Sequence, residues 1–237
     1  MCPDPTDPNT GVSSSILLRG GLYELESTYI FERLLRAGDT VIDIGANIGW
    51  YTLLSAKKVG PHGRVVACEP EPHNFELLEA SVRLNQFANV TLLRKGVSDR
   101  TGKVSLHLSP TNAGGHTIME TGNQAGEITV DCTTIDELVR ELSLGKVDVV
   151  KIDAEYSEPL ILLGARALLS RGQPSYIMME YSPDAWVLHE PLLLRMFNEF
   201  DAFEIYRHKL SHTKISDLPR DRQGMLLLIR KPDTGPS

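Results

Sequence analysis

"VIDIGANIGW", residues 41–50, begins as a buried strand and ends as a turn. Its first four residues are β-branched and apolar except for Asp43, and β-branched apolar residues favour strands. Gly45, Asn47 and Gly49 follow at two-residue spacing, and glycine permits the backbone conformations that a tight turn requires. The stretch therefore predicts a strand with an acid near its tip, followed by a turn that leads into a helix.

Apolar strands alternate with amphipathic helices along most of the chain. No helix separates the last two expected strands, so these should pair as an antiparallel hairpin at one edge of the sheet. Apolar strands that are separated by helices indicate a mostly parallel sheet with helices on both faces. The predicted fold is therefore α/β, with a seven-stranded, mostly parallel sheet. Besides the strand in 41–50, the expected strands are residues 64–70, 89–93, 147–153, 175–180, 203–208 and 225–230.

Two segments interrupt this alternation. Residues 103–108, KVSLHL, are expected to form a polar, hairpin-like strand, and residues 109–127 are rich in Gly, Thr and Asn and are expected to form a loop. Loops of this length are often functional lids. His116 in this loop could then act as a base, although loop histidines are more often simply solvated.

Composition places the chain among ordinary globular proteins. Of its 237 residues, 41% are hydrophobic and 23% are charged, and the formal net charge is -7. This charge and the lack of a basic stripe argue against nucleic acid or an anionic membrane as a partner. No apolar run approaches the roughly 20 residues that span a bilayer. Three widely spaced cysteines fit reduced thiols, so we expect a cytoplasmic protein.

The same alternation suggests a single domain. Residues 16–231 contain neither an internal repeat nor a linker rich in Pro and Ser. Residues 1–15 are rich in Pro, Asp and Ser and do not resemble a signal peptide, so we expect a disordered tail there. Residues 232–237 are expected to form a second disordered tail. The oligomeric state is not predicted.

The turn after the first strand indicates which ligand the sheet would bind. Ligands of open α/β sheets bind beyond the carboxyl ends of the strands. The turn reads G-A-N-I-G-W rather than G-x-G-x-x-G, with Asn47 and Trp50 in place of the second and third glycines that a dinucleotide needs. Asp43 would repel a pyrophosphate but would attract a sulfonium or ammonium group.

Glu69 supplies the second half of this argument. It ends the second strand, 20 residues after Gly49. An acid at this point accepts the hydroxyl groups of a ribose. Asp43, the glycine turn and Glu69 together describe an adenosine with a cationic tail, which is S-adenosylmethionine.

Four segments, in this order, carry a resemblance to a known family: DTVIDIGANIGWYT, VVACEPEPHNFELLEASVRLN, NVTLLRKGVSDRTG and VVKIDAEYSEPLILLGA. They resemble the FkbM family of S-adenosylmethionine-dependent methyltransferases over about residues 20–181. The resemblance implies a Rossmann-like class I methyltransferase fold. It also implies O-methylation of a hydroxyl group on a sugar, a polyketide or a similar secondary metabolite.

The resemblance further assigns residues to the cofactor. Gly21, Tyr23 and Glu24 match a short N-terminal family segment that is expected to close over it, and Asp153 is expected at both the cofactor and the acceptor. The other residues so implied are Asp43, Gly45, Asn47 and Gly49 at the methionine end, Glu69 at the ribose, and the stretch Val97, Ser98 and Asp99 at the adenine.

One position departs from the family pattern. The family commonly reads K-[IL]-D-[VI]-E-G-x-E after its fourth strand, whereas this chain reads KIDAEYSE, with Tyr156 in place of the glycine. If that glycine takes a positive φ, Tyr156 must either form a different turn or accept about 1–3 kcal/mol of strain. The acceptor side of the site is therefore less well defined by the resemblance.

Methylation of an alcohol needs a base, and three strand-end carboxylates are candidates. Asp153 and Glu155 follow the fourth strand, and Glu180 ends the fifth. A base near the acceptor contributes about 10²–10⁴-fold to the rate. Asp153 could equally brace a loop or cap a helix, and Lys151 could pair with one of these acids. No group of His, Asp and Glu has the spacing of metal ligands, so no metal is predicted.

Two other functions share these features. A nicotinamide-dependent oxidoreductase has a related fold, although the glycine turn argues against it. A non-catalytic cofactor-binding protein is compatible with Tyr156. The acceptor, expected to be a small molecule, is not identified by the sequence.

Overall fold

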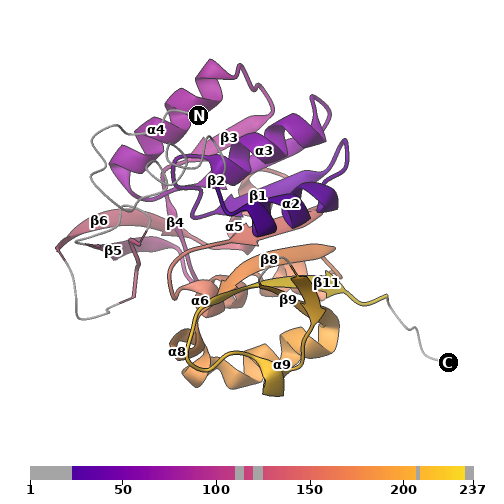
Figure 1. Ribbon diagram of the computed structural model, residues 1–237. Coiled ribbons are helices and arrows are strands. Elements are labelled where there is room, and N and C mark those ends of the chain that lie inside the picture. Colours follow the sequence, from indigo (N-terminus) through magenta and orange to yellow (C-terminus); the bar gives the residue numbers. More distant parts are fainter. Residues whose placement is uncertain (1–22, 110–114, 120–124, 207–208, 233–237) are drawn as a thin grey trace.

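The computed structural model describes residues 23–109, 115–119, 125–206 and 209–232. In this part of the chain the main sheet has eight strands in the order β10-β9-β11-β8-β7-β1-β2-β3 (Figure 1). The strands from β3 to β8 run parallel, whereas β11 is antiparallel to both β8 and β9. The strands are β1 Thr40–Ile44, β2 Arg64–Cys68, β3 Val90–Leu93, β7 Val149–Ile152, β8 Tyr176–Tyr181, β9 Phe200–Tyr206, β10 Lys209–His212 and β11 Gly224–Arg230.

The predicted α/β fold is confirmed, with a difference at one edge of the sheet. The last predicted strand, β11, lies between β8 and β9 rather than outside them, and β10 forms the edge. All four residues of β10 are exposed. An edge strand that buries no side chain has no apolar alternation, so no sequence pattern indicates this eighth strand.

A second, smaller sheet stands beside the main one (Figure 1). Its order is β4-β6-β5, with β4 Gly96–Val97, β5 Gly102–Leu108 and β6 Gly126–Thr133. Strand β5 was expected, but β6 was not. Half of β6 is exposed, and within it only Val130, Cys132 and Thr133 are buried, so its apolar pattern is short.

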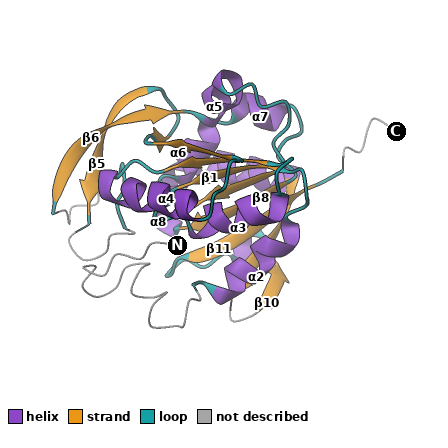
Figure 2. Cartoon of the chain, turned by 90° about the horizontal axis from the view of Figure 1, so that it is seen from above, coloured by secondary structure: helices purple, strands orange, loops and turns teal. Residues whose placement is uncertain are grey.

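Helices cover both faces of the main sheet. Figure 2 shows α3 and α4 on one side of the strands and α5 and α7 on the other. Among the described residues, no helix combines the length and the apolar character needed to cross a membrane. The helices are α2 Leu25–Leu34, α3 Trp50–Val59, α4 Pro72–Leu84, α5 Ile135–Glu141, α6 Glu158–Leu163, α7 Arg166–Ser170, α8 Pro183–Trp186 and α9 Glu190–Glu199, with 3-10 turns η1 Val187–His189 and η2 Ile215–Asp217.

Strand β1 lies inside the main sheet, between β7 and β2, and its side chains alternate between two hydrophobic cores. Val41 packs with residues of α2 and α3, including Phe31, whereas Ile42 and Ile44 pack with residues of α5, α6 and α7. Asp43 shares the α3 side with Val41, because successive side chains of a strand point to opposite faces. An acid is thus placed under α3 by the period of the strand.

Two helices begin at residues that favour a helix start. The side chain of Thr134 accepts a hydrogen bond from the backbone N–H of Glu137 at 3.0 Å and so caps α5, as the capping-box pattern predicts. Helix α6 begins after Ser157, with Pro159 in its first turn. Both helices therefore start close to the ends of the strands that form the site.

Gly45 brings the turn after β1 against the end of β7. Its φ is 74°, and a Cβ atom at this position would lie 1.7 Å from the carbonyl oxygen of Asp153. Only glycine fits such an approach, since any other residue would clash with backbone atoms that have no room to move. The glycine is thus needed for contact between two strand ends of this chain, apart from any contact with a ligand.

We expect Gly45→Ala to destabilise the protein far more than Gly38→Ala does. Gly38 also has a positive φ, 89°, but no atom lies within 4 Å of the Cβ that alanine would add. Gly38→Ala should cost about 1–2 kcal/mol of unfolding free energy. The clash at Gly45 should add a further cost of at least about 2 kcal/mol. Urea unfolding of both variants measures the difference, and equal losses would contradict the close contact.

Candidate functional site

A cavity of about 220 Å³ opens at the carboxyl ends of the main strands. Its walls come from the ends of β1, β2, β7 and β8, from the start of α2 and from the small sheet. The structure therefore brings together residues that are far apart in the sequence. Of the residues predicted from sequence, those that line the cavity are Tyr23, Glu24, Gly45, Asn47, Glu69, Val97, His116, Asp153, Glu155 and Glu180.

Four predicted cofactor residues, Asp43, Gly49, Ser98 and Asp99, are not part of the cavity wall. Asp43 is 1% exposed and accepts a hydrogen bond from the hydroxyl of Thr52 in α3 at 2.5 Å. Gly49 lies against α4, where a Cβ would approach the side chain of Leu78 to 2.7 Å. Direct contact of these four residues with a cofactor stays a prediction. Gly21 lies outside the described residues.

Glu69 connects the turns that follow β1 and β2. One of its carboxylate oxygens accepts the backbone N–H of Asn47 at 2.8 Å, and the other accepts that of Glu71 at 2.9 Å. The residue is 5% exposed, and burial raises its pKa to about 7, although the two N–H groups oppose the change. A carboxylate can accept more than two hydrogen bonds, so Glu69 keeps capacity for hydroxyl groups in the cavity.

The start of α2 is fastened to α3 beside the cavity. The carboxylate of Glu24 accepts a hydrogen bond from the hydroxyl of Tyr51 at 2.7 Å. The indole N–H of Trp50 donates to the hydroxyl of Thr28 at 2.8 Å, and the ring of Tyr23 meets that of Trp50 edge to face, with centroids 6.0 Å apart. Tyr23 and Glu24 are thereby held in place as part of the cavity wall.

Lys151 in β7 is the cation buried beneath this wall. Its side chain is 1% exposed, and its Nζ lies 2.8 Å from a carboxylate oxygen of Asp153 and 4.6 Å from the ring centroid of Tyr51. Asp43 is its partner in the register of β1 with β7. Burial lowers the pKa of Lys151, but Asp153 and Glu24 outweigh this effect and raise it, so the side chain is charged. The expected pairing of Lys151 with a strand-end acid is therefore observed.

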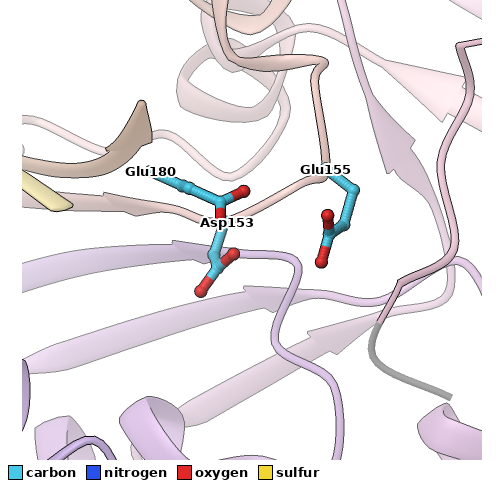
Figure 3. Close-up of side chains that lie close together, drawn as sticks. All are labelled: Asp153, Glu155 and Glu180. Carbon is cyan, nitrogen blue, oxygen red and sulfur yellow. The ribbon is translucent and has the colours of Figure 1, made fainter. Parts of the chain in front are cut away.

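Asp153, Glu155 and Glu180 form what we call the acidic cluster. One carboxylate oxygen from each residue lies within 4.8 Å of the others, and Figure 3 shows the three groups gathered at the strand ends. Burial and the nearby Asp153 raise the pKa of Glu155 to about 7 and that of Glu180 to about 10. Burial and mutual repulsion therefore disfavour full ionisation of the cluster, because water screens the three carboxylates poorly from one another.

A left-handed turn presents Glu155 to the cavity. Glu155 has a φ of 45° and Tyr156 a φ of 71°. The hydroxyl of Thr117 donates a hydrogen bond to the carbonyl of Glu155 and so holds this turn. Tyr156 thus accepts the strained conformation in which the family has glycine, at a cost of order 1–3 kcal/mol. Residues with positive φ are often found at functional sites, and Asn47 and Glu24 in the same wall share this property.

Sequence reasoning missed several residues of the cavity wall. His116 does lie there, but its Nδ1 accepts the backbone N–H of Ser109 at 3.0 Å, and burial lowers its pKa. That nitrogen has no lone pair left with which to act as a base. The residues that sequence reasoning did miss come from loops, from the small sheet, from α4 and from β11: Pro70, Asn74, Lys95, Leu106, Ile118 and Met225.

We expect Lys151→Met to destabilise the protein by about 3–5 kcal/mol, because it leaves buried carboxylates without a cation. Lys103→Met is a matched control, since Lys103 pairs with Asp131 at 2.9 Å but both side chains are at least 60% exposed. Exposed pairs contribute at most about 1 kcal/mol. Chemical denaturation of the two variants measures both losses. A loss at Lys151 as small as that at Lys103 would show that the buried pair is not needed.

Stability should depend on pH through Glu69. Its pKa in the folded protein, about 7, exceeds the ordinary value of 4.5, so the folded state binds this proton more tightly than the unfolded chain does. The Glu69 contribution is then fully present below pH 4.5 and is lost as the pH rises through 7. The loss is at most about 3 kcal/mol.

Glu69→Gln isolates this contribution. The difference in unfolding free energy between wild type and variant should fall between pH 5 and pH 8 by up to about 3 kcal/mol. Glu79→Gln on the exposed side of α4 is the control and should show a difference that does not vary with pH. A difference for Glu69→Gln that is equally constant would disprove the raised pKa.

Comparison with known proteins gives a family. A profile described as the methyltransferase FkbM domain matches residues 43–205. The hexuronic acid methyltransferase AglP of Haloferax volcanii is 35% identical over 127 residues, which are 53% of this chain and 49% of the relative. The 31-O-demethyl-FK506 methyltransferase FkbM of Streptomyces tacrolimicus is 26% identical over 158 residues, or 55% of this chain and 60% of the relative.

A solved structure agrees with these relatives at the level of the fold. The crystal structure of the methyltransferase FkbM from Methylobacillus flagellatus superposes with a TM-score of 0.55 at 19% identity, over 91% of this chain and 47% of the other. This chain therefore spans less than two thirds of each of these three proteins. The predicted class I methyltransferase fold and the predicted cofactor, S-adenosylmethionine, are confirmed. The resemblance found in the sequence is confirmed as well, and the chain belongs to the FkbM family of methyltransferases.

Proposed function

We propose that this chain transfers a methyl group from S-adenosylmethionine to an oxygen of a sugar or secondary metabolite. The observation that carries the proposal is a single cavity with Glu69 at one side and the acidic cluster at another. The relatives point the same way, since one is named for a hexuronic acid and the other for a 31-O-demethyl group. The proposed acceptor is accordingly a small molecule that carries oxygen nucleophiles.

The residues of the cavity fit the cofactor on three counts. Glu69 has both oxygens anchored by backbone N–H groups, which presents a fixed acceptor to a ribose diol. The wall contains five acidic side chains but only one Lys or Arg side chain among the described residues, Lys95, and Lys151 is buried beneath it. A sulfonium and an ammonium group would therefore be attracted. Apolar surface from Pro70, Val97 and Leu106 suits an adenine ring. In contrast, a pyrophosphate would meet carboxylates, which disfavours a nicotinamide dinucleotide.

Bound S-adenosylmethionine supplies an electrophilic methyl carbon on a positively charged sulfur. The acceptor oxygen forms a bond to this carbon while the carbon–sulfur bond breaks and its electron pair goes to sulfur. The hydroxyl proton passes to a carboxylate of the chain, for which Asp153, Glu155 and Glu180 are the candidates by position. Alignment of the reacting atoms can account for about 7–11 kcal/mol of the barrier, so holding the acceptor is the main task of the cavity.

Ligand-induced changes in thermal stability test the cofactor. S-Adenosylhomocysteine at 100 times its dissociation constant should stabilise the protein by about 2.7 kcal/mol, whereas NAD should have no effect. Glu69→Gln should weaken S-adenosylhomocysteine binding at least tenfold, because a charged acceptor of the ribose hydroxyls is lost. Glu79→Gln is the control and should bind normally. Stabilisation by NAD instead would favour the oxidoreductase alternative.

Turnover separates an enzyme from a non-catalytic binding protein. The full chain should release S-adenosylhomocysteine when it is supplied with the donor and a panel of hexuronic acids, neutral sugars and macrolides that carry free hydroxyl groups. A methyl group should appear on oxygen in the product, as detected by mass spectrometry and NMR. Cofactor binding without turnover on any member of the panel would support the non-catalytic alternative, and transfer to nitrogen would refute O-methylation.

A further inference from the structure

We propose that the acidic cluster binds one divalent metal ion of the kind that prefers oxygen ligands, such as Mg²⁺ or Mn²⁺. Asp153, Glu155 and Glu180 would each supply one carboxylate oxygen. No metal is predicted from the sequence, because the three acids come from the ends of different strands and their spacing is not that of a metal motif. The proposal depends on their arrangement in space.

The distances between the carboxylates suit a single ion. The three oxygens lie within 4.8 Å of one another. Oxygens that share one Mg²⁺ or Ca²⁺ at about 2.0–2.6 Å stand about 3–5 Å apart. Small changes in side-chain torsion would therefore complete the coordination, and water or an acceptor oxygen would occupy the remaining positions. Mg²⁺ is commonly bound in this way, by a few carboxylates together with water and substrate.

Unsatisfied polar atoms beside the cluster also point to a ligand. The hydroxyl of Ser157 is 1% exposed, borders the same cavity and, among the described residues, has no hydrogen-bond partner. One carboxylate oxygen of Glu180 is likewise buried and unpartnered within the described part of the chain. A buried polar group that lacks a partner costs about 1–3 kcal/mol. Two such groups at one cavity wall indicate that water or an ion completes the site.

The charges around the cluster leave a deficit that one divalent ion would balance. Lys151 pairs with Oδ2 of Asp153 at 2.8 Å, whereas within the described ranges no Lys or Arg forms an ion pair with Glu155 or Glu180. Carboxylates this close repel one another strongly when water is excluded. A divalent ion would replace this repulsion with attraction to all three groups.

An ion at this position would also bear on the acceptor, and this step rests on the proposed function. A metal-bound hydroxyl group loses its proton more readily than a free one, so the ion would assist attack on the methyl carbon. It would also allow an anionic acceptor, such as a sugar acid, to bind next to carboxylates that would otherwise repel it. The acceptor class and the metal are thereby linked.

Binding of Mn²⁺ to the full-length, chelator-treated chain tests the proposal without any turnover. Electron paramagnetic resonance and isothermal titration should both show one Mn²⁺ per chain, displaced by Mg²⁺. Glu155→Gln and Glu180→Gln should each weaken this binding at least tenfold, whereas Glu79→Gln, which changes an exposed acid far from the cavity, should not. Binding that is absent in wild type, or equal in all variants, would overturn the proposal.

Stability of the metal-free variants separates loss of the ion from loss of the fold. Because each Gln variant removes a repelling charge, its thermal midpoint without metal should equal or exceed that of wild type. Mn²⁺ at a concentration that saturates wild type should then raise the midpoint of wild type more than that of Glu180→Gln. A midpoint that rises equally in both would count against the site. Since these readouts need neither methyl donor nor acceptor, failure of the metal site and failure of the proposed methyl transfer are distinguishable.

Discussion

The buried ammonium group of Lys151 is the constraint on which the site depends. It lies in the central part of the sheet, where a lone charge would be strongly unfavourable, and is compensated by Asp153 at 2.8 Å and by Asp43 on the neighbouring strand. A cation held there fixes one carboxylate at the cavity wall and permits others to gather near it. The acidic character of the cavity and the packing of β1 against β7 are therefore parts of one electrostatic arrangement.

Backbone geometry places the same strand ends close enough for this arrangement to work. Gly45 allows the turn after β1 to touch the carbonyl of Asp153, and the left-handed Glu155 and Tyr156 turn the chain back toward the cavity immediately afterwards. Strain of this kind persists only where surrounding contacts hold it. Here the contacts include the hydrogen bond from Thr117, which pairs with His107 of β5, so the segment beside the small sheet helps to shape this side of the cavity.

Much of this could be predicted from the sequence, because strand ends are readable and parallel strands bring their ends together. The positions of Glu69, Asp153 and Glu180 followed from the ends of three apolar runs. The alternation of side chains along β1 is readable from the sequence, but the face that α3 covers is not. Asp43 lies under α3 because it points to the same face as Val41. Strand β6 and the cavity residue Ile118 also escaped prediction, since exposed or irregular segments have no periodic pattern.

The position of Asp43 changes how the opening motif is understood. An acid at the tip of a first strand suggests a ligand for the cofactor, yet here it is 1% exposed, bound to Thr52 and next to Lys151. Its effect on a ligand can be indirect, through Lys151, which links it to Asp153 at the cavity wall. The motif thus has two parts, residues that line the cavity and an acid that is buried beneath it. Gly45 and Asn47 line the cavity, and Asp43 contributes to the charge balance beneath it.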